Sequence, residues 1–240
     1  MTEFEMLRLK QLINDSENIV FFGGAGVSTE SGIKDFRSKD GIYNMKFDYP
    51  PEYMLSHSFF VSHPKEFYDF YRNMMLCDGI MPNPAHYALA ELEKRGKLKA
   101  VITQNIDGLH QMAGSKIVYE LHGSVKRNYC SRCGKFFDEK FISNSSEVPY
   151  CGCGGIVKPD VVLYEEGLDS KTLENAINAI SQADLLIVAG TSLTVYPAAG
   201  LIDYFKGNYT VLINRDATPF DDRADIVIRE PVGETLKKVI

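Results

Sequence analysis

Residues 23–37 read GGAGVSTESGIKDFR and follow directly on the apolar run NIVFF of residues 18–22. A strand-like segment therefore leads straight into a glycine-rich turn. Its glycines let the backbone turn tightly and approach a pyrophosphate, while Ser28, Thr29 and Ser31 are typical caps of a helix start, whose free N–H groups favour anions. The stretch predicts a nucleotide site, although by itself it also suits a plain tight connection.

The dinucleotide motif of dehydrogenases matches this stretch poorly. That motif needs G-x-G-x-x-G and an acidic ribose ligand about 20 residues later, at the end of a second strand. Here Thr29 stands at the third glycine position, and no apolar strand leads into residues 44–51. Hydride transfer is therefore disfavoured. Residues 35–37 instead place a carboxylate, an aromatic ring and a guanidinium side by side, which suits holding a phosphate and covering a planar ring.

The composition limits the class of protein. A chain of 240 residues with 45% apolar content can bury a full core. With 26 basic and 32 acidic residues and a formal net charge of −6, it has no broad basic surface for nucleic acid. The N-terminus lacks a signal-peptide pattern, and no apolar run approaches the about 18 residues of a membrane span. We expect a cytoplasmic protein with no membrane partner and no specific nucleic-acid partner.

Short runs rich in Val and Ile alternate with helical patterns. This alternation predicts a doubly wound, Rossmann-like α/β fold with a parallel sheet. The expected strands cover residues 19–22, 100–103, 184–189 and 210–213, and the clearest helices cover residues 4–15, 84–95 and 171–182.

Two stretches break the alternation. Residues 38–82 are rich in aromatic side chains without a clear strand, and residues 126–158 hold four of the five cysteines. We expect one domain over residues 1–240 whose smaller module is built from a helical insertion, residues 38–82, and a zinc-binding insertion, residues 126–158. The core would comprise approximately residues 1–37, 83–125 and 159–240.

The cysteines of the second insertion predict a metal site. Cys130-x-x-Cys133 is followed, after seventeen residues, by Cys151-x-Cys153. In a protein of this kind the spacing favours a structural zinc over disulfides, and four thiolates leave no open position for chemistry. The second pair is one residue shorter than usual, and reduced cysteines without metal are the alternative. Cys77 lies apart and is interpreted as a packed residue.

Polar groups also follow the other expected strands. Residues 103–110 read TQNIDGLH, whose amides and carboxylate suit ribose hydroxyls and a carboxamide, although an Asn/Asp turn is an alternative. Residues 190–192 and 214–216 follow two further strands. Ligands of open α/β sheets bind at the carboxyl ends of the strands, so these loops predict one shared site.

Among the five histidines, His122 is the candidate general base. It ends the strand-like residues 117–121 and precedes Gly123 and the cysteine insertion. An imidazole with a pKa near neutrality suits removal of a proton from a sugar hydroxyl. The alternative is a structural histidine with satisfied hydrogen bonds.

Several long motifs occur together in one order. They are GAGVSTESGIKDFR, TQNIDGLH, LHG, the four cysteines, KPDVVLYEE, GTSLTVYPAA and INRDATPFDDRAD. Over nearly its whole length the chain resembles the sirtuin family, most closely the compact bacterial sirtuins. The resemblance implies one sirtuin catalytic domain that acts as an NAD-dependent protein deacetylase, with NAD+ as co-substrate, structural Zn2+ and acetylated-lysine proteins or peptides as partners.

The resemblance also implies roles for individual residues. The catalytic set would be His122, Asn105 and Asp107. The cofactor-binding set would be Gly24, Ala25, Gly26, Thr29, Asp35, Phe36, Arg37, Tyr43, Gln104, Asn105, Ile106, Asp107, His122, Gly190, Thr191, Ser192, Asn214, Arg215 and Val232. The substrate peptide would pair with Val161, Val162, Leu163, Tyr164, Val195 and Tyr196, and the zinc ligands would be Cys130, Cys133, Cys151 and Cys153.

The implied mechanism transfers the acetyl group of acetyl-lysine to ADP-ribose. The acyl oxygen attacks C1′ of the ribose as nicotinamide leaves, His122 accepts a proton through the ribose hydroxyls, and water completes release of lysine and 2′-O-acetyl-ADP-ribose. Mono-ADP-ribosyl transfer and a non-catalytic binding module are the alternatives; His122 and an apolar acyl-lysine tunnel argue against the first, and Asn105, Asp107 and His122 together argue against the second.

Two local features bear on the substrate. Sirtuins that prefer acidic acyl groups share a Tyr-x-x-Arg motif, but here Tyr68 is followed three residues later by Tyr71, with Arg72 one step beyond. On a helix that step rotates the side chain by about 100 degrees, so we expect deacetylation and little desuccinylation. The usual Phe-Gly-Glu after the substrate strand reads YEE at residues 164–166.

Overall fold

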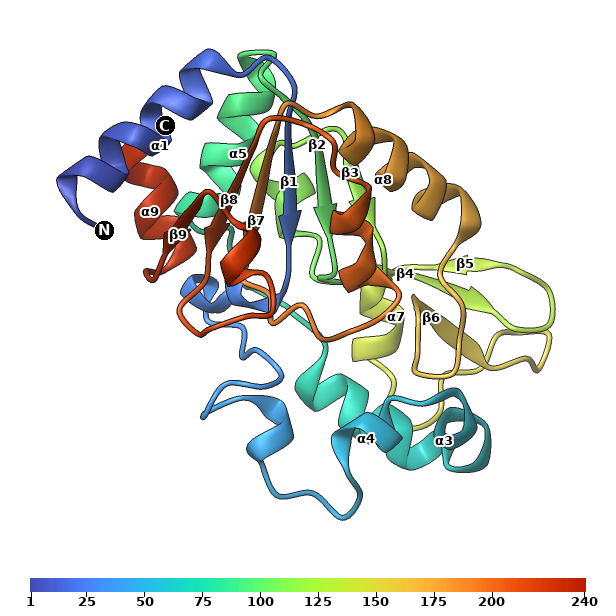
Figure 1. Cartoon of the computed structure of the whole chain (residues 1–240). Helices are drawn as coiled ribbons and strands as arrows, with labels where there is room; N and C mark the ends of the chain where they lie inside the picture. Colours follow the sequence, from blue (N-terminus) through green and yellow to red (C-terminus); the bar gives the residue numbers. More distant parts are fainter.

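The computed structural model describes all residues from 1 to 240. Its central sheet has six parallel strands in the order β3-β2-β1-β7-β8-β9, so successive strands run outward from β1 to one edge and from β7 to the other (Figure 1). The predicted doubly wound fold is confirmed. The strands are β1 (Ile19–Gly23), β2 (Leu98–Thr103), β3 (Val118–Glu120), β7 (Leu185–Ala189), β8 (Tyr209–Ile213) and β9 (Ile226–Ile228).

Both faces of the sheet are covered, which explains the unbroken apolar runs. Phe21 and Phe22 are neighbours on β1 but belong to two different cores, one on each face, and neither is exposed. A strand buried on both faces reads as a continuous apolar run rather than as an alternation. One face is covered by α1 (Glu3–Asp15), α5 (Pro84–Lys94) and α9 (Val232–Val239), and the other by α8 (Ser170–Gln182) and η4 (Ala198–Tyr204) (Figure 1).

A third core lies in the two insertions. Phe67 and Tyr71 of the first insertion are fully buried in one cluster with Val157 of the second. The tyrosine hydroxyl of Tyr68 donates to the carbonyl of Val157 at 2.7 Å, which joins the insertions further. Their elements are α2 (Pro51–Met54), α3 (His57–Ser62) and α4 (Pro64–Met74), followed by the three-stranded sheet β5 (Phe136–Phe137), β4 (Gly123–Cys130) and β6 (Val157–Val161) with α7 (Glu139–Ser143).

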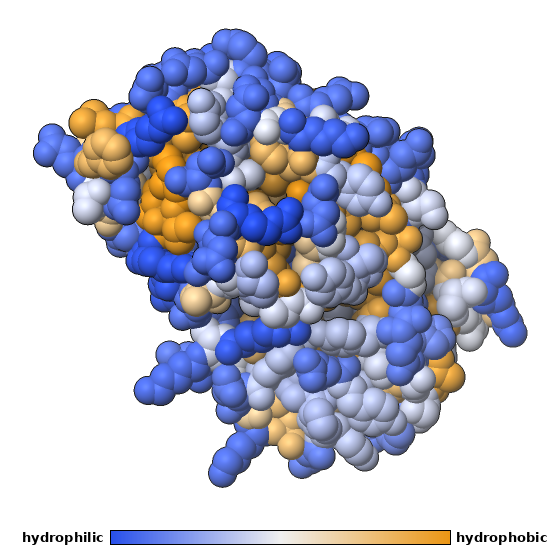
Figure 2. All heavy atoms as spheres, in the orientation of Figure 1, coloured by the Kyte–Doolittle hydropathy of each residue, from blue (hydrophilic) through white to orange (hydrophobic).

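The surface in Figure 2 is largely hydrophilic, with hydrophobic side chains visible over the α1 and α9 side of the sheet and toward the side of α8. Phe4 and Leu7 of α1 are exposed apolar side chains, at 78% and 57% exposure. No helix of the structure has the length and apolar character needed to cross a membrane.

The turn after β1 differs from the expected helix start. It consists of two 3-10 turns, η1 (Ala25–Val27) and η2 (Thr29–Ser31), and no side chain caps either of them. The prediction that Ser28, Thr29 and Ser31 cap a helix is therefore wrong. Thr29 instead donates to the carbonyl of Gly26 at 3.0 Å, while Ser31 accepts from the amide of Asn83. The predicted tight glycine turn is present, because Val27 N–H donates to the Gly24 carbonyl at 3.0 Å; Gly26 N–H donates to the Gly190 carbonyl of a second loop at 2.8 Å.

Gly26→Ala tests this turn. A Cβ at residue 26 would lie 2.8 Å from Gly190 Cα, a backbone atom that cannot yield as a flexible side chain would. We expect a lower melting temperature and a loss of unfolding free energy of about 1–3 kcal/mol, as for overpacked cores. Thermal and urea unfolding measure it. Gly167→Ala is the control, because a Cβ there meets nothing within 4 Å; equal stability of the two variants would contradict the close approach.

Candidate functional site

One cavity of about 370 Å³ lies beside the carboxyl ends of β1, β2, β7 and β8 and is closed on its other side by residues of the insertions. All residues expected to bind cofactor or peptide, or to act in catalysis, line this cavity; their individual roles stay predictions. They are Gly24, Ala25, Gly26, Thr29, Asp35, Phe36, Arg37, Tyr43, Gln104, Asn105, Ile106, Asp107, His122, Val161, Val162, Leu163, Tyr164, Gly190, Thr191, Ser192, Val195, Tyr196, Asn214, Arg215 and Val232.

Ser28 connects the two polar residues that follow β2. Its hydroxyl donates to Asp107 Oδ2 at 2.7 Å and accepts from the side-chain amide of Asn105 at 3.0 Å. All three residues are at least nine-tenths buried. The other carboxylate oxygen of Asp107 accepts from Leu109 N–H at 2.9 Å. Both carboxylate oxygens are thus held in place, and each retains acceptor capacity for a ligand amide.

Sequence reasoning missed this role of Ser28. The sequence predicts a helix cap at this position, because a serine that follows a glycine-rich turn commonly caps the start of a helix. Its partners lie 77 and 79 residues away in sequence, and only the pairing of β1 with β2 brings them together. In the sequence, the one feature that points to a role for Ser28 in the site is its place in the same motif as the glycines that line the cavity.

His122 has a defined tautomer. Its Nδ1 lies 3.0 Å from the carbonyl oxygen of Gln104. A carbonyl only accepts, so Nδ1 carries the proton and Nε2 is left as the basic nitrogen. Burial lowers the pKa of His122 below its ordinary value of 6.5, and the hydrogen bond to Gln104 opposes that effect. The imidazole is therefore neutral and ready to accept a proton near neutral pH.

The other histidines do not line the cavity. His86 and His110 are buried against each other with ring centroids 4.7 Å apart. Burial lowers the pKa of His86 to about 4 and also holds the pKa of His110 well below its ordinary value. His57 and His63 belong to α3 and its C-terminal end. Of the five histidines, only His122 offers a base to a molecule in the cavity.

One part of the cavity is apolar. Phe36, Ile106 and Leu163 line it together with residues that sequence reasoning did not assign to the site. Those additional residues are Ile33, Ile42, Leu55, Met74, Met75 and Cys77. Cys77 is buried as expected, and burial raises the pKa of its thiol to about 12, so it stays protonated.

The acidic-acyl motif is absent from the cavity as well as from the sequence. Tyr68 is fully buried, and neither it nor Arg72 lines the cavity. The Arg72 guanidinium instead donates to Asp69 at 2.7 Å and to the carbonyl of Glu147 at 2.9 Å. Tyr68 and Arg72 are therefore not placed to bind the carboxylate of an acidic acyl group in this cavity.

The four cysteines of the second insertion meet at a separate site. Their sulfur atoms all lie within 4.8 Å of one another. The Cys130–Cys153 and Cys133–Cys151 sulfur distances are 3.4 and 3.7 Å, and no disulfide is present. Tetrahedral zinc with Zn–S bonds of about 2.3 Å separates its sulfurs by about 3.8 Å, so the cluster fits a structural zinc. The short spacing of Cys151-x-Cys153 therefore still allows both sulfurs to join the other two in one site.

Removing one thiolate tests the zinc site. We expect Cys151→Ser to lower bound zinc from one per chain and to lower the melting temperature, because the ion holds the insertion together. Elemental analysis of the purified protein, beside a thermal melt, measures both. Cys77→Ser is the control and keeps its zinc; a zinc content unaffected by Cys151→Ser would argue against these ligands.

Comparison with known proteins agrees with this geometry. The chain is 61% identical to an NAD-dependent protein deacetylase of Clostridium acetobutylicum over 236 residues, covering 97% of this chain and 96% of the relative. It is also 61% identical to one of Clostridium perfringens, with 97% of each chain covered. A solved structure of Sir2 with a p53 peptide and NAD+ superimposes with a TM-score of 0.86 at 43% identity, covering 98% of this chain and 96% of that one. The profile of the Sir2 family matches residues 24–197, and the chain belongs to that family.

Proposed function

We propose that this protein is an NAD-dependent protein-lysine deacetylase. It transfers the acetyl group of acetyl-lysine to ADP-ribose and releases nicotinamide, free lysine and 2′-O-acetyl-ADP-ribose. The observation that carries the proposal is the position of His122, whose Nδ1 bonds to the Gln104 carbonyl and which lines the same cavity as the buried Asn105–Ser28–Asp107 network. Its family and its relatives named as NAD-dependent protein deacetylases support the same activity.

Different side chains would orient the cofactor, accept the proton and exclude water. Bound NAD+ supplies a ribose carbon from which nicotinamide can leave. Asp107 and Asn105, oriented by Ser28, would hold the nicotinamide carboxamide and ribose in the reactive pose. His122 Nε2 would accept a proton from a ribose hydroxyl, with the Gln104 carbonyl stabilising the imidazolium that forms. Phe36, Ile106 and Leu163 would exclude competing water.

Two loops at the cavity offer free backbone groups to a peptide. No hydrogen bond engages the carbonyl oxygen of Val162 or the N–H of Glu165. On the second loop the N–H groups of Thr194 and Val195 are equally free. An extended peptide between these segments would satisfy such groups by strand addition, which reads backbone rather than sequence. The acyl-lysine side chain would then enter the apolar part of the cavity.

We infer a preference for neutral acyl groups. The apolar lining offers no buried cation to a carboxylate, since Arg72 is held by Asp69 and Glu147.

We also infer a cytoplasmic location. Such a location suits four thiols that stay reduced to bind zinc. The division of the chain into a core and a two-insertion module is likewise our proposal, supported by the third core that the insertions share.

The first experiment incubates the purified protein with an acetyl-lysine peptide, with and without NAD+. We expect deacetylation only with NAD+, formation of O-acetyl-ADP-ribose, and a fall of about 10²–10⁴-fold in rate for His122→Ala, as for loss of a general base. Mass spectrometry follows the peptide and the nucleotide. His63→Ala, which removes an imidazole outside the cavity, and a succinyl-lysine peptide of the same sequence are the controls.

The outcomes separate the alternatives. ADP-ribose on protein with the peptide still acetylated would establish a mono-ADP-ribosyltransferase instead. If neither acetyl-lysine nor lysine with longer neutral acyl groups reacted, a non-catalytic binding module would be the remaining interpretation. Rapid removal of succinyl would refute the neutral-acyl preference.

The pH dependence follows from the environment of His122. Only the neutral imidazole accepts a proton, and burial holds its pKa below 6.5, so the neutral form persists to lower pH than for a free histidine. We expect kcat/KM to level off toward neutral pH and to fall on an acid limb whose midpoint lies below 6.5. Initial rates at low substrate concentration between pH 5 and 8 measure it. A midpoint above 6.5 would contradict the buried-base assignment.

A further inference from the structure

Two phenols meet across the cavity. The hydroxyls of Tyr43 and Tyr164 are 2.6 Å apart, although the residues are separated by 121 positions in sequence. Both residues line the cavity, Tyr43 from the stretch after the glycine-rich turn and Tyr164 from the segment after β6. Where the usual sirtuin pattern places phenylalanine, residue 164 has a hydroxyl, so this bond depends on a departure from that pattern.

Tyr43 is tied to the residues that cover the cavity. Its N–H donates to the carbonyl of Phe36 at 2.9 Å, and its ring packs edge-on against the Phe36 ring with centroids 5.5 Å apart. The Arg37 guanidinium lies over the same ring, 5.1 Å from its centroid. Tyr43 therefore contacts both Phe36 and Arg37.

Tyr164 is anchored on the opposite side. Its N–H donates to the Leu55 carbonyl at 2.9 Å, and its own carbonyl accepts from His57 N–H at 3.0 Å. The next two residues hold the segment further. Glu165 adopts a left-handed conformation with φ of 75° while its carboxylate accepts from Ser58 N–H at 2.9 Å.

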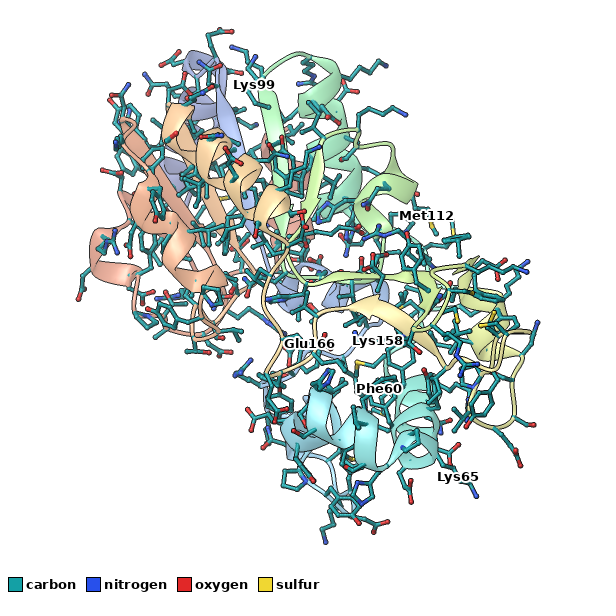
Figure 3. The ribbon with its side chains drawn as sticks, turned by 90° about the vertical axis from the view of Figure 1, so that its right-hand side faces the viewer. Phe60, Lys65, Lys99, Met112, Lys158 and Glu166 are labelled. Atoms are coloured by element: carbon teal, nitrogen blue, oxygen red, sulfur yellow. The ribbon has the colours of Figure 1, made fainter.

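Glu166 completes this anchor. Its carboxylate accepts from Leu163 N–H at 2.9 Å, pairs with Lys158 at 3.0 Å and lies 2.9 Å from His57 Nδ1. In Figure 3 the labelled Lys158 and Glu166 lie close together between the central sheet and the helices of the first insertion. The backbone of Tyr164 is thus a fixed point, and Tyr43 lies in the 3-10 turn η3 (Ile42–Asn44), whose backbone bonds to the carbonyls of Asp35 and Phe36.

We propose that Tyr43 and Tyr164 are positioning residues that form a latch between the NAD side and the peptide side of the cavity. The inference rests on the proposed function. The hydrogen bond holds Phe36 and Arg37 over bound NAD+ and ties their closure to the segment that pairs with the acyl-lysine peptide. Neither hydroxyl takes part in the chemistry.

The latch works across the pH range of the reaction. Burial raises the pKa of Tyr43 above its ordinary value, and the hydrogen bond with Tyr164 raises it further. The Tyr43 phenol therefore stays protonated where His122 titrates. Removing the latch should leave the acid limb of the pH profile in place, which separates its role from that of the base.

The test compares NAD+ binding by Tyr43→Phe, Tyr164→Phe and the double variant. Each keeps the ring and removes one hydroxyl. A net hydrogen bond corresponds to about 2- to 10-fold in an equilibrium constant, so we expect each variant to raise the Kd for NAD+ by that factor. Because both hydroxyls serve one bond, the double variant should be no weaker than either single one. Calorimetry with NAD+ in the presence of the unacetylated lysine peptide, which has no acetyl group to transfer, measures the Kd without turnover.

Steady-state kinetics add a second readout. The KM for NAD+ should rise by the same factor, with kcat and the acid limb unchanged. Tyr204→Phe is the control, since Tyr204 is exposed and lies outside the cavity, and it should bind as the unaltered protein does. Multiplying effects in the double variant, an effect of only one single variant, or none at all would overturn the latch. No NAD+ binding by the unaltered protein would overturn the proposed function and the latch together.

Discussion

Gly26 and Gly190 touch where the order of strands in the sheet reverses, between the ends of β1 and β7. The Gly26 N–H bonds the Gly190 carbonyl, and neither residue has a side chain to hold the two loops apart. This contact closes the floor of the crevice that a doubly wound sheet opens at that point. It also fixes the direction of the chain toward Ser28, and hence the polar network around Asp107.

The cavity has two walls of different origin. The strand ends of the central sheet supply amides, carboxylates and hydroxyls, while the insertions supply Leu55, Met74 and Met75. His122 lies between β3 and β4, where the chain passes from the central sheet to the second one. A base at that junction faces polar groups on one side and apolar groups on the other. An acyl-lysine and a dinucleotide can therefore meet at one imidazole.

Some elements were readable from local pattern and others were not. The runs of β1 and β7 were evident because strands buried on both faces are apolar throughout. β9 and α9 were missed: Ile226–Ile228 is only three residues long, and α9 follows it within a few residues. The prediction of helix caps after β1 was wrong because serine and threonine side chains can form hydrogen bonds with distant partners as well as with the local backbone. Ser28 does so, through contacts that no local pattern contains.

By itself, the sequence determined the alternation of strands and helices, the glycine-rich turn, the four cysteines and the motifs of the family. These depend on residue types at short spacing, where backbone geometry and ligand chemistry act locally. Only the tertiary structure decided which nitrogen of His122 is basic, that Ser28 orients Asn105 and Asp107, and that Tyr43 meets Tyr164. Each of these rests on a hydrogen bond between residues far apart in sequence, and such bonds form only after the sheet and the insertions have packed.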